Sequence, residues 1–209
     1  MARSPRRASK ARSGRVAPPL APDGRVQRGE RNRGAIVDAL FELLGEGVLE
    51  PTAERVAARA GVGLRSVFRH FTDMERLYAA LDGRVRAQLE PIVTGGEPSG
   101  SVAERSRAML QLRVRVFERI APYKRAANVN RQRSPFLHAT HRQFVRVLRE
   151  HLLRWLPELA EAPREIVDAV ELATSFEAWD RLRGDQGLSA ARAHAAVEAT
   201  LSALLSRSG

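Results

Sequence analysis

The apolar residues of this chain recur at spacings of three and four, and prolines and glycines divide the pattern into segments. Thr52 follows Pro51 and is a residue type that caps helices through its side-chain oxygen, so a helix is expected from about residue 52. Val56, Ala57 and Ala60 then form one inward stripe of small and branched residues. Period-two runs rich in Val, Ile, Thr and Tyr are absent from the sequence, and the pattern therefore predicts an all-α fold.

A second short helix is expected directly after this one. Gly61 suits the left-handed conformation that ends a helix, and Val62 fills the corner that follows. The expected buried side of the next helix is Leu64, Val67, Phe68 and Phe71, and its polar side is Arg65, Ser66, Arg69 and His70. A major groove admits one helix, and arginine donates two hydrogen bonds to guanine there, so the two helices indicate a helix-turn-helix DNA reader. The alternative for the polar side is an ordinary solvated helix face.

The segment from about Arg28 to Leu81 resembles the amino-terminal domain of the TetR family of bacterial transcriptional repressors. The matching residues are Ile36, Ala39, Leu40, Phe41 and Gly47, then Thr52, Val56, Ala57 and Ala60-Gly61-Val62, then Val67-Phe68-Arg69-His70-Phe71, Glu75 and Leu77. The resemblance implies a three-helix DNA-binding domain whose third helix enters the major groove, and a larger carboxy-terminal helical domain that binds a small ligand and dimerises. It implies a homodimeric transcriptional repressor that a ligand releases from DNA.

Two positions depart from the pattern of that family. Phe68 stands where the family commonly has tyrosine, and Met74 stands where it commonly has lysine. Both family residues suit phosphate contact, so each departure removes a polar group from the expected interface. Arg69 and Arg76 lie one helical step away, and our hypothesis is that they replace these contacts.

The net charge of +11 is concentrated at the amino terminus. Residues 1–33 contain ten arginines and lysines against Asp23 and Glu30, which gives +8 and leaves only +3 for the remainder. Several prolines and little apolar periodicity predict a disordered basic arm at residues 1–27. Such an arm binds phosphates or the minor groove beside the reading helix. The alternative is a solubilising tail or a remnant of cloning.

The predicted DNA-binding domain spans residues 28–72. Its candidate phosphate contacts are Thr52 and the arginines that precede or begin the first helix. The complete set of predicted DNA-contacting residues is Arg28, Arg31, Arg33, Thr52, Gly63, Arg65, Ser66, Phe68, Arg69 and His70.

Residues 73–209 are expected to form the ligand-binding and dimerisation domain, with a connecting helix from residue 73. Thr72 and Glu75 have the spacing of a capping box, and the helix is expected to end before Pro91. Residues 94–100 read as a linker. Gly83, inside the connecting helix, is either a bend needed for switching or a tolerated weak position.

Two further helices are expected, from Ser101 to about Ile120 and from Pro135 to Leu156, with Pro122 and Pro135 bounding a polar connection. Arg113 falls on an inward stripe, where either an internal salt bridge or an acidic ligand would neutralise it. His138 and His141 lie three residues apart, but further metal ligands are not evident, so a role in a pocket is the better interpretation. The predicted ligand-binding residues are Met109, Arg113, Phe117, Tyr123, His141, Phe144 and Trp155.

The last two helices are predicted to form a homodimer. The segment from Pro163 to Arg183 has two apolar stripes, and the segment from Leu188 to Leu205 carries alanines that permit close helix approach. Two reading helices related by a twofold axis would bind a palindromic operator with half-sites about 34–36 Å apart. A monomer that buries these stripes internally is the alternative.

The sequence argues against other functional classes. There is no cysteine, so disulfides and thiolate metal sites are excluded, and no catalytic or cofactor-binding motif is evident, so we expect neither an enzyme nor a cofactor. No apolar run reaches the roughly 18 residues of a membrane span, so a cytoplasmic protein without a membrane partner is expected. A non-regulatory, architectural DNA-binding protein is the alternative function. It would bind double-stranded DNA without sequence preference and would not need the large second domain.

Overall fold

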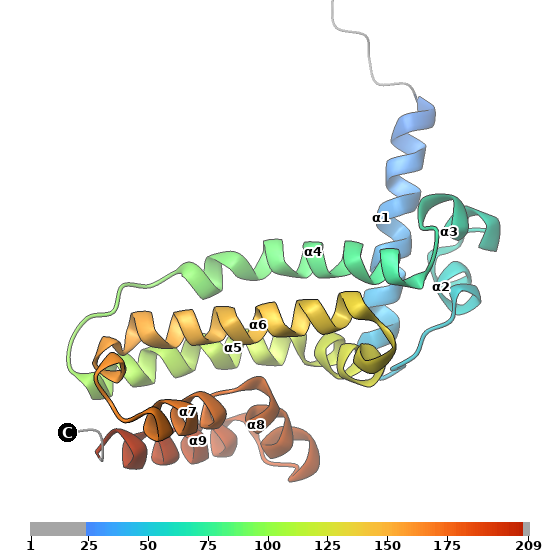
Figure 1. Cartoon of the computed structure of the whole chain (residues 1–209). Helices are drawn as coiled ribbons and strands as arrows, with labels where there is room; N and C mark the ends of the chain where they lie inside the picture. Colours follow the sequence, from blue (N-terminus) through green and yellow to red (C-terminus); the bar gives the residue numbers. More distant parts are fainter. Residues whose placement is uncertain (1–23, 207–209) are drawn as a thin grey trace, which may run out of the picture.

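The computed structural model describes residues 24–206, and this part of the chain is helical without strands (Figure 1). The helices and turns, in order, are α1 Gly24–Gly45, α2 Ala53–Ala60, α3 Leu64–His70, α4 Met74–Thr94, α5 Val102–Asn130, the 3-10 turn Arg131–Arg133, α6 Pro135–Trp155, the 3-10 turn Pro157–Ala160, α7 Arg164–Ala173, α8 Phe176–Asp180, the π-helical turn Arg181–Asp185 and α9 Ala190–Leu205. The predicted all-α fold, with a small amino-terminal and a larger carboxy-terminal helical domain, is confirmed.

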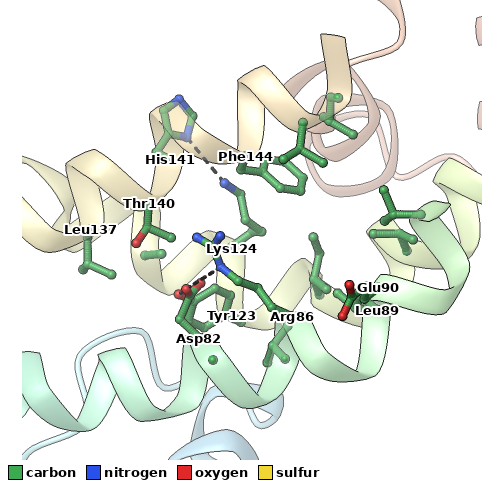
Figure 2. Close-up of a pocket in the computed structure, with 18 of the residues that line it drawn as sticks. Asp82, Arg86, Leu89, Glu90, Tyr123, Lys124, Leu137, Thr140, His141 and Phe144 are labelled. Carbon is green, nitrogen blue, oxygen red and sulfur yellow. Dashed lines mark hydrogen bonds and ion pairs between the residues drawn. The ribbon is translucent and has the colours of Figure 1, made fainter. Parts of the chain in front are cut away.

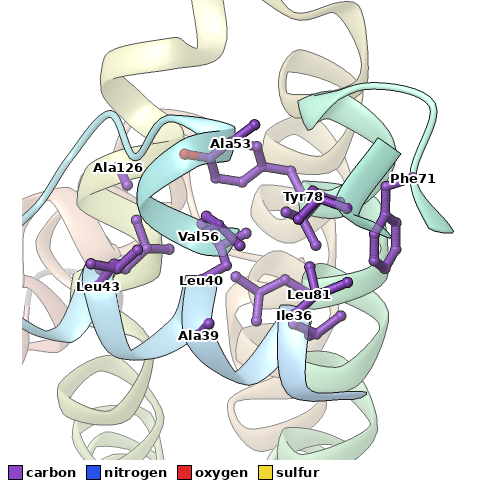
Figure 3. Close-up of a cluster of buried hydrophobic side chains, with 14 of the residues drawn as sticks. Ile36, Ala39, Leu40, Leu43, Ala53, Val56, Phe71, Tyr78, Leu81 and Ala126 are labelled. Carbon is purple, nitrogen blue, oxygen red and sulfur yellow. The ribbon is translucent and has the colours of Figure 1, made fainter. Parts of the chain in front are cut away.

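One long helix, α1, and two short ones, α2 and α3, form the amino-terminal domain. Thr52 caps α2 by accepting a hydrogen bond from the Arg55 N–H, and Gly61 ends it with φ 65°. Both features agree with the sequence pattern. The side chains of α1, α2, α3 and the start of α4 meet in one core, which Figure 3 shows. Its fully buried members include Ile36, Leu40, Leu44, Val56, Leu77 and Leu81.

The start of α1 lies earlier than the predicted boundary of the basic arm. Residues 24–27 belong to the helix, although they were expected in the arm. Arginine and glutamine are good helix formers, so the helix extends beyond the part that packs on the core. The rest of the predicted arm, residues 1–23, lies outside the described residues.

Helix α4 differs from its prediction at both ends. Asp73, rather than Thr72, caps it and accepts a hydrogen bond of 2.8 Å from the Arg76 N–H. The helix also continues through Pro91 to Thr94, because packing of Leu89 and Val93 on the neighbouring helices compensates for one missing backbone hydrogen bond. The predicted linker is confirmed as the irregular segment between α4 and α5.

Helix α5 is the central element of the larger domain. It has 29 residues and contains Pro122, which was expected to end it. Buried side chains on both sides of this proline, Ile120 and Tyr123, keep the helix continuous. Helix α5 contacts α1, α4, α6, α8 and α9. Figure 1 shows α4 on one side of the α5–α6 pair and α7 to α9 on the other.

The carboxy-terminal segment is divided where one helix was predicted. Helix α7 ends at Ala173, and Ser175 caps α8 by accepting a hydrogen bond of 3.1 Å from the Ala178 N–H. The buried Thr174 between them donates its hydroxyl to the Val170 carbonyl. Side-chain competition for backbone groups thus breaks the predicted helix from 163 to 183 into two.

Candidate DNA interface and effector cavity

Helix α3 presents most of its surface to solvent. Val67 and Phe71 anchor it in the core, while Leu64 and Phe68 are 38% and 49% exposed. The prediction that Leu64 and Phe68 lie on the buried side is wrong. A helix of seven residues in a small domain has only one narrow stripe in contact with its neighbours. Phe68 therefore joins the presented face, as expected of a DNA-contacting residue.

The polar residues of α3 lie together on this face. Arg65 and Arg69 are exposed, and the Arg69 guanidinium donates a 3.2 Å hydrogen bond to the Ser66 hydroxyl. Burial, Arg69 and Arg33 lower the pKa of His70, so its imidazole is neutral at neutral pH. Its Nε2 atom is buried and has no hydrogen-bond partner within the described residues. The face thus offers guanidinium donors, whereas the Nε2 atom of His70 is inaccessible in this structure.

Arg33 contacts the end of α3 as well as being exposed. Its guanidinium donates a 3.2 Å hydrogen bond to the His70 carbonyl and lies 4.4 Å from the centre of the Phe71 ring. A cation at the carboxyl end of a short helix interacts favourably with the helix dipole. Arg33 therefore ties α1 to the end of α3 and orients the reading helix.

The remaining predicted phosphate contacts flank α3. Arg28 and Arg31 are exposed on α1, Thr52 is exposed at the start of α2, and Gly63 directly precedes α3. On the other side, Arg76 is exposed in the first turn of α4, whereas Met74 packs partly against the core. These positions leave Arg76 available as the replacement cation that the sequence suggested.

A cavity of about 560 Å³ lies between α4, α5 and α6 (Figure 2). Its apolar wall includes Leu89, Val93, Val116, Ile120, Phe144, Val147 and Leu148. Its polar groups include Asp82, Arg86, Tyr123, Lys124, Asn128, Arg131, Thr140 and His141. A mostly apolar cavity with a few placed polar groups is typical of a small-molecule site.

One end of the cavity is closed by a bonded trio of side chains. The Tyr123 hydroxyl donates a 2.8 Å hydrogen bond to Asp82, and Arg86 forms a 2.7 Å ion pair with the other oxygen of the same carboxylate. Burial and the nearby Asp82 raise the pKa of Tyr123. The trio joins α4 to α5 beside the amino-terminal core, to which Tyr123 also belongs.

Lys124 is the buried cation of this cavity. It is 5% exposed, its Nζ lies 3.4 Å from His141 Nδ1, and it sits 4.2 Å from the centre of the Phe144 ring. Burial lowers the pKa of Lys124 to about 8. Burial and the neighbouring Lys124 lower the pKa of His141, which lies 4.0 Å from Glu177. A neutral imidazole is thus the hydrogen-bond acceptor of the ammonium group.

The predicted ligand-binding residues fall into two groups. Tyr123, His141 and Phe144 line the cavity. The other four are buried in the core and do not line the cavity: Met109, Arg113 and Trp155, and Phe117, which packs against the cavity residue Phe144. The sequence reasoning missed Lys124, because the helix was expected to end at Pro122. Its position four residues after the inward Ile120 is the signal that would have revealed it.

Arg113 is 2% exposed and is satisfied within the protein. It donates to the Thr174 carbonyl and hydroxyl at 2.8 Å, to the Leu148 carbonyl, and to His151 Nδ1 at 3.5 Å. Its partners within the protein are thus carbonyl, hydroxyl and imidazole groups rather than the carboxylate of an internal salt bridge. Carbonyl oxygens carry enough partial negative charge to hold a buried guanidinium.

Within residues 24–206, no group of three or more histidine, aspartate or glutamate side chains has the arrangement of a metal site, and His138 is exposed while His141 faces Lys124. In the same part of the chain, no helix combines the length and apolar character needed to cross a membrane.

An apolar strip lies on the outer side of the carboxy-terminal helices. Helices α7 and α9 contact each other. Leu172 on α7 is 69% exposed, and Ala191, Ala195 and Ala199 form an exposed stripe on α9. An exposed leucine on one helix and exposed small residues on a contacting helix are features that suit close helix packing.

Comparison with known proteins gives a family match for the amino-terminal domain and solved structures of similar fold. Residues 36–81 match the model for bacterial regulatory proteins of the tetR family. The crystal structure of a transcriptional regulator from Rhodococcus sp. Rha1 has a TM-score of 0.65 and 19% identity, over 85% of this chain and 96% of that chain. A protein assigned to the TetR-family transcriptional regulators, from Mesorhizobium loti MAFF303099, has a TM-score of 0.60 and 19% identity, over 86% of this chain and 97% of that chain.

No curated protein matches the chain. At 19% identity, the two solved structures establish a shared fold. The family match covers α2, α3 and the adjoining parts of α1 and α4, which form the helix-turn-helix and its core. Residues 36–81 therefore have the helix-turn-helix domain of the tetR family, and the chain as a whole shares the fold of the two solved regulators.

Proposed function

We propose that this protein is a cytoplasmic repressor that binds a palindromic operator as a homodimer and leaves it when a small molecule enters the cavity. It acts by binding rather than by catalysis. The observation that carries this proposal is that the cavity and the amino-terminal core share residues. Tyr123, Ala127 and Leu137 line the cavity and also pack in the core that holds α3.

The proposed reading surface is the exposed side of α3. Arg65 and Arg69 offer bidentate donors to guanine, and Ser66 and His70 offer smaller hydrogen-bonding groups. Phe68, at 49% exposure, offers an apolar contact to a thymine methyl group or a sugar. The proposed phosphate contacts are Arg28, Arg31, Thr52, Gly63 and Arg76, with Arg33 holding the helix in place.

The proposed release follows the contacts of α4. This helix forms one wall of the cavity, and its first turn is joined to α6 because Glu75 accepts hydrogen bonds from the Ser134 hydroxyl at 2.5 Å and the Phe136 N–H at 3.2 Å. A ligand that separates α4 from α5 and α6 therefore moves the helix that directly follows α3. Ligand binding lowers the DNA affinity only if the ligand prefers a conformation of the protein that binds DNA less tightly.

The proposed dimer forms through α7 and α9. Their exposed apolar strip, which includes Leu172 and the alanines of α9, is the surface that a second copy would cover. A twofold axis at this surface would place two α3 helices about one DNA turn apart, roughly 34–36 Å. Light scattering tests this part: we expect a dimer in solution, with a Leu172→Arg variant shifted towards monomer.

Selection of bound fragments from the source genome tests the function as a whole. We expect a recovered palindrome, and weaker binding to it by an Arg65→Ala, Arg69→Ala double variant. Binding without sequence preference would instead support the architectural alternative.

The salt dependence of binding tests whether Arg76 replaces the cation missing at Met74. Arg76→Ala should reduce the slope of log affinity against log salt by about 0.9, and an unchanged slope would reject Arg76 as a phosphate contact.

A further inference from the structure

Lysine is rare in this chain, and one of its two lysines is buried beside the cavity. Among 35 basic residues, only Lys10 and Lys124 are lysines, and all others are arginines. Lys124 is 5% exposed and lies on the cavity wall. Burial of an ammonium group is unfavourable unless hydrogen bonds and a counter-charge compensate for the lost water.

The surroundings of Lys124 compensate for this only at a distance: Glu177 and Asp82 act to raise its pKa, but neither is ion-paired with it. Within residues 24–206, no carboxylate oxygen lies within 4.0 Å of its Nζ. The two oxygens of Asp82 are used by Tyr123 and Arg86. Glu177 lies 4.0 Å from His141 rather than beside the ammonium group. The nearest carboxylates are therefore engaged elsewhere or too distant to form an ion pair.

Its hydrogen-bonding capacity is also incompletely used. An ammonium group has three donors, and Lys124 has one hydrogen-bond partner, His141 Nδ1 at 3.4 Å, besides the rings of Phe144 and Phe176, whose centres lie 4.2 Å and 5.7 Å from its Nζ. Figure 2 shows the amine between α5 and α6, directed towards His141. Thr140, one residue earlier on α6, adds a hydroxyl to the same cavity wall. Two donors of the cation and a neighbouring hydroxyl are thus available to an occupant.

The rest of the cavity is apolar along its length. On α4 the lining continues from Asp82 beyond Leu89 to Thr94, which corresponds to about 18 Å along a helix axis. The apolar wall, with Leu89, Val93 and Leu148, lies further along the helices than the polar groups around Lys124. Glu90, the other acidic residue of the lining, lies two turns along α4 from Asp82 (Figure 2).

We propose that the cavity binds an amphipathic monocarboxylate, whose carboxylate pairs with Lys124 and whose apolar body lies against Leu89, Val93 and Leu148. This inference rests on the proposed function only in taking the cavity as the effector site. The ammonium group of Lys124, a compact cation with two donors that lack a hydrogen-bond partner, matches one carboxylate group. Binding of the acid gives Lys124 an ion-pair partner and removes the apolar wall from water in the same step.

The test compares acids with neutral analogues of the same shape. Calorimetry on the full-length protein without DNA would use decanoate against decanol, and a naphthoate against the corresponding naphthalene methanol. We expect at least one acid to bind ten times more tightly than its alcohol. If no acid binds, if both alcohols bind as tightly as the acids, or if decylammonium binds more tightly than decanoate, the proposal is overturned.

Two variants and a control assign the effect to Lys124. Lys124→Met should weaken acid binding at least tenfold and leave alcohol binding unchanged or stronger, and Lys124→Gln should do the same if the methionine variant does not fold. Arg125→Met is the matched control, because Arg125 is the next residue of α5 but is exposed and pairs with Asp180 outside the cavity. Equal acid affinity in the wild type and both Lys124 variants would contradict the proposal.

A separate arm distinguishes this inference from the proposed function. Fluorescence anisotropy would follow a labelled operator fragment as the bound acid is added. If the acid binds but the operator stays bound, regulation by the cavity is wrong while the ligand class stands. If the operator is recognised specifically but no acid binds, the ligand class is wrong while specific DNA recognition stands.

Discussion

Two cations are buried along the same helix, and their surroundings differ. Arg113, in the closed core between α5, α6 and α7, is held by two main-chain carbonyls, a hydroxyl and an imidazole nitrogen. Lys124, three turns further along α5, faces a cavity of about 560 Å³ with one imidazole nitrogen and the rings of Phe144 and Phe176 as partners. The hydrogen-bond donors of Arg113 are thus largely satisfied by the protein, whereas two donors of Lys124 have no hydrogen-bond partner.

This difference separates a structural charge from a binding charge. Both residues lie on an inward helix face, and both pKa values are lowered by burial, to about 10 for Arg113 and about 8 for Lys124. Burial alone therefore does not identify a ligand site. The number of satisfied donors and the presence of adjoining space identify it.

The largest expected effect is at Arg113. Arg113→Met should lower the free energy of unfolding by about 4 kcal/mol, because the Thr174 and Leu148 carbonyls lose a buried donor. Acid binding in the cavity should be unaffected in the folded fraction. Denaturant titration measures the stability, with the exposed Arg115→Met on the same helix as control. If Arg113→Met lowers the free energy of unfolding by less than 1 kcal/mol, Arg113 is not the structural charge that the comparison with Lys124 requires.

At Lys124 the expected effect has the opposite sign. Lys124→Met should raise the free energy of unfolding at pH 7 by about 2 to 3 kcal/mol, because an incompletely paired charge leaves the interior. The pKa of Lys124 in the folded protein, about 8, is below its ordinary 10.5, so the unfolded chain binds more protons between these values. Wild-type stability should therefore rise from pH 8 to 9.5, and the variant should lack that rise. Denaturant midpoints at several pH values measure it, and parallel curves would be the contrary result.

A smaller effect is expected where the cavity meets the amino-terminal core. Tyr123→Phe removes the hydroxyl that donates to Asp82 and should cost about 2 kcal/mol of stability. Tyr78→Phe is the matched control, since Tyr78 is buried in the same core but its hydroxyl has no partner within the described residues. The Tyr123 variant should also change the ligand response of DNA binding. Equal behaviour of the two variants would argue against coupling through Asp82.

The smallest effect is expected at Gly83. A Cβ at this position meets no atom within 4 Å, and the residue has an ordinary helical conformation. Gly83→Ala should raise stability by about 1 kcal/mol, as it does in exposed helix interiors. Thermal unfolding measures this, and operator release by the bound acid gives the second readout. Normal release would dispose of the bend hypothesis, whereas lost release would support it.

Local signals in the sequence predict the amino-terminal domain well. Thr52 and Gly61 act through contacts within their own helix and turn, so a pattern of a few residues suffices to place them. The same signals were misleading at Pro91 and Pro122, because tertiary packing keeps α4 and α5 continuous through these prolines. Phe68 was misassigned because the small number of neighbours around α3 is not visible in its spacing.

The cavity was predictable only in part. Tyr123, His141 and Phe144 were identified as polar or aromatic residues on inward stripes. The same criterion selected Arg113 and Trp155, which lie in the closed core, since spacing does not distinguish a filled interior from an open one. The partners of Asp82 and Lys124 come from different helices, and sequence alone does not bring them together.

Operator discrimination tests the central claim, that the exposed side of α3 reads a specific DNA sequence, most directly. The affinity of the full-length protein for a genomically selected palindrome should exceed its affinity for a shuffled duplex by a factor of about 10³ or more at physiological salt. The Arg65→Ala, Arg69→Ala double variant should lose most of that ratio and keep its binding to the shuffled duplex. A ratio near one for the wild-type protein would contradict the account.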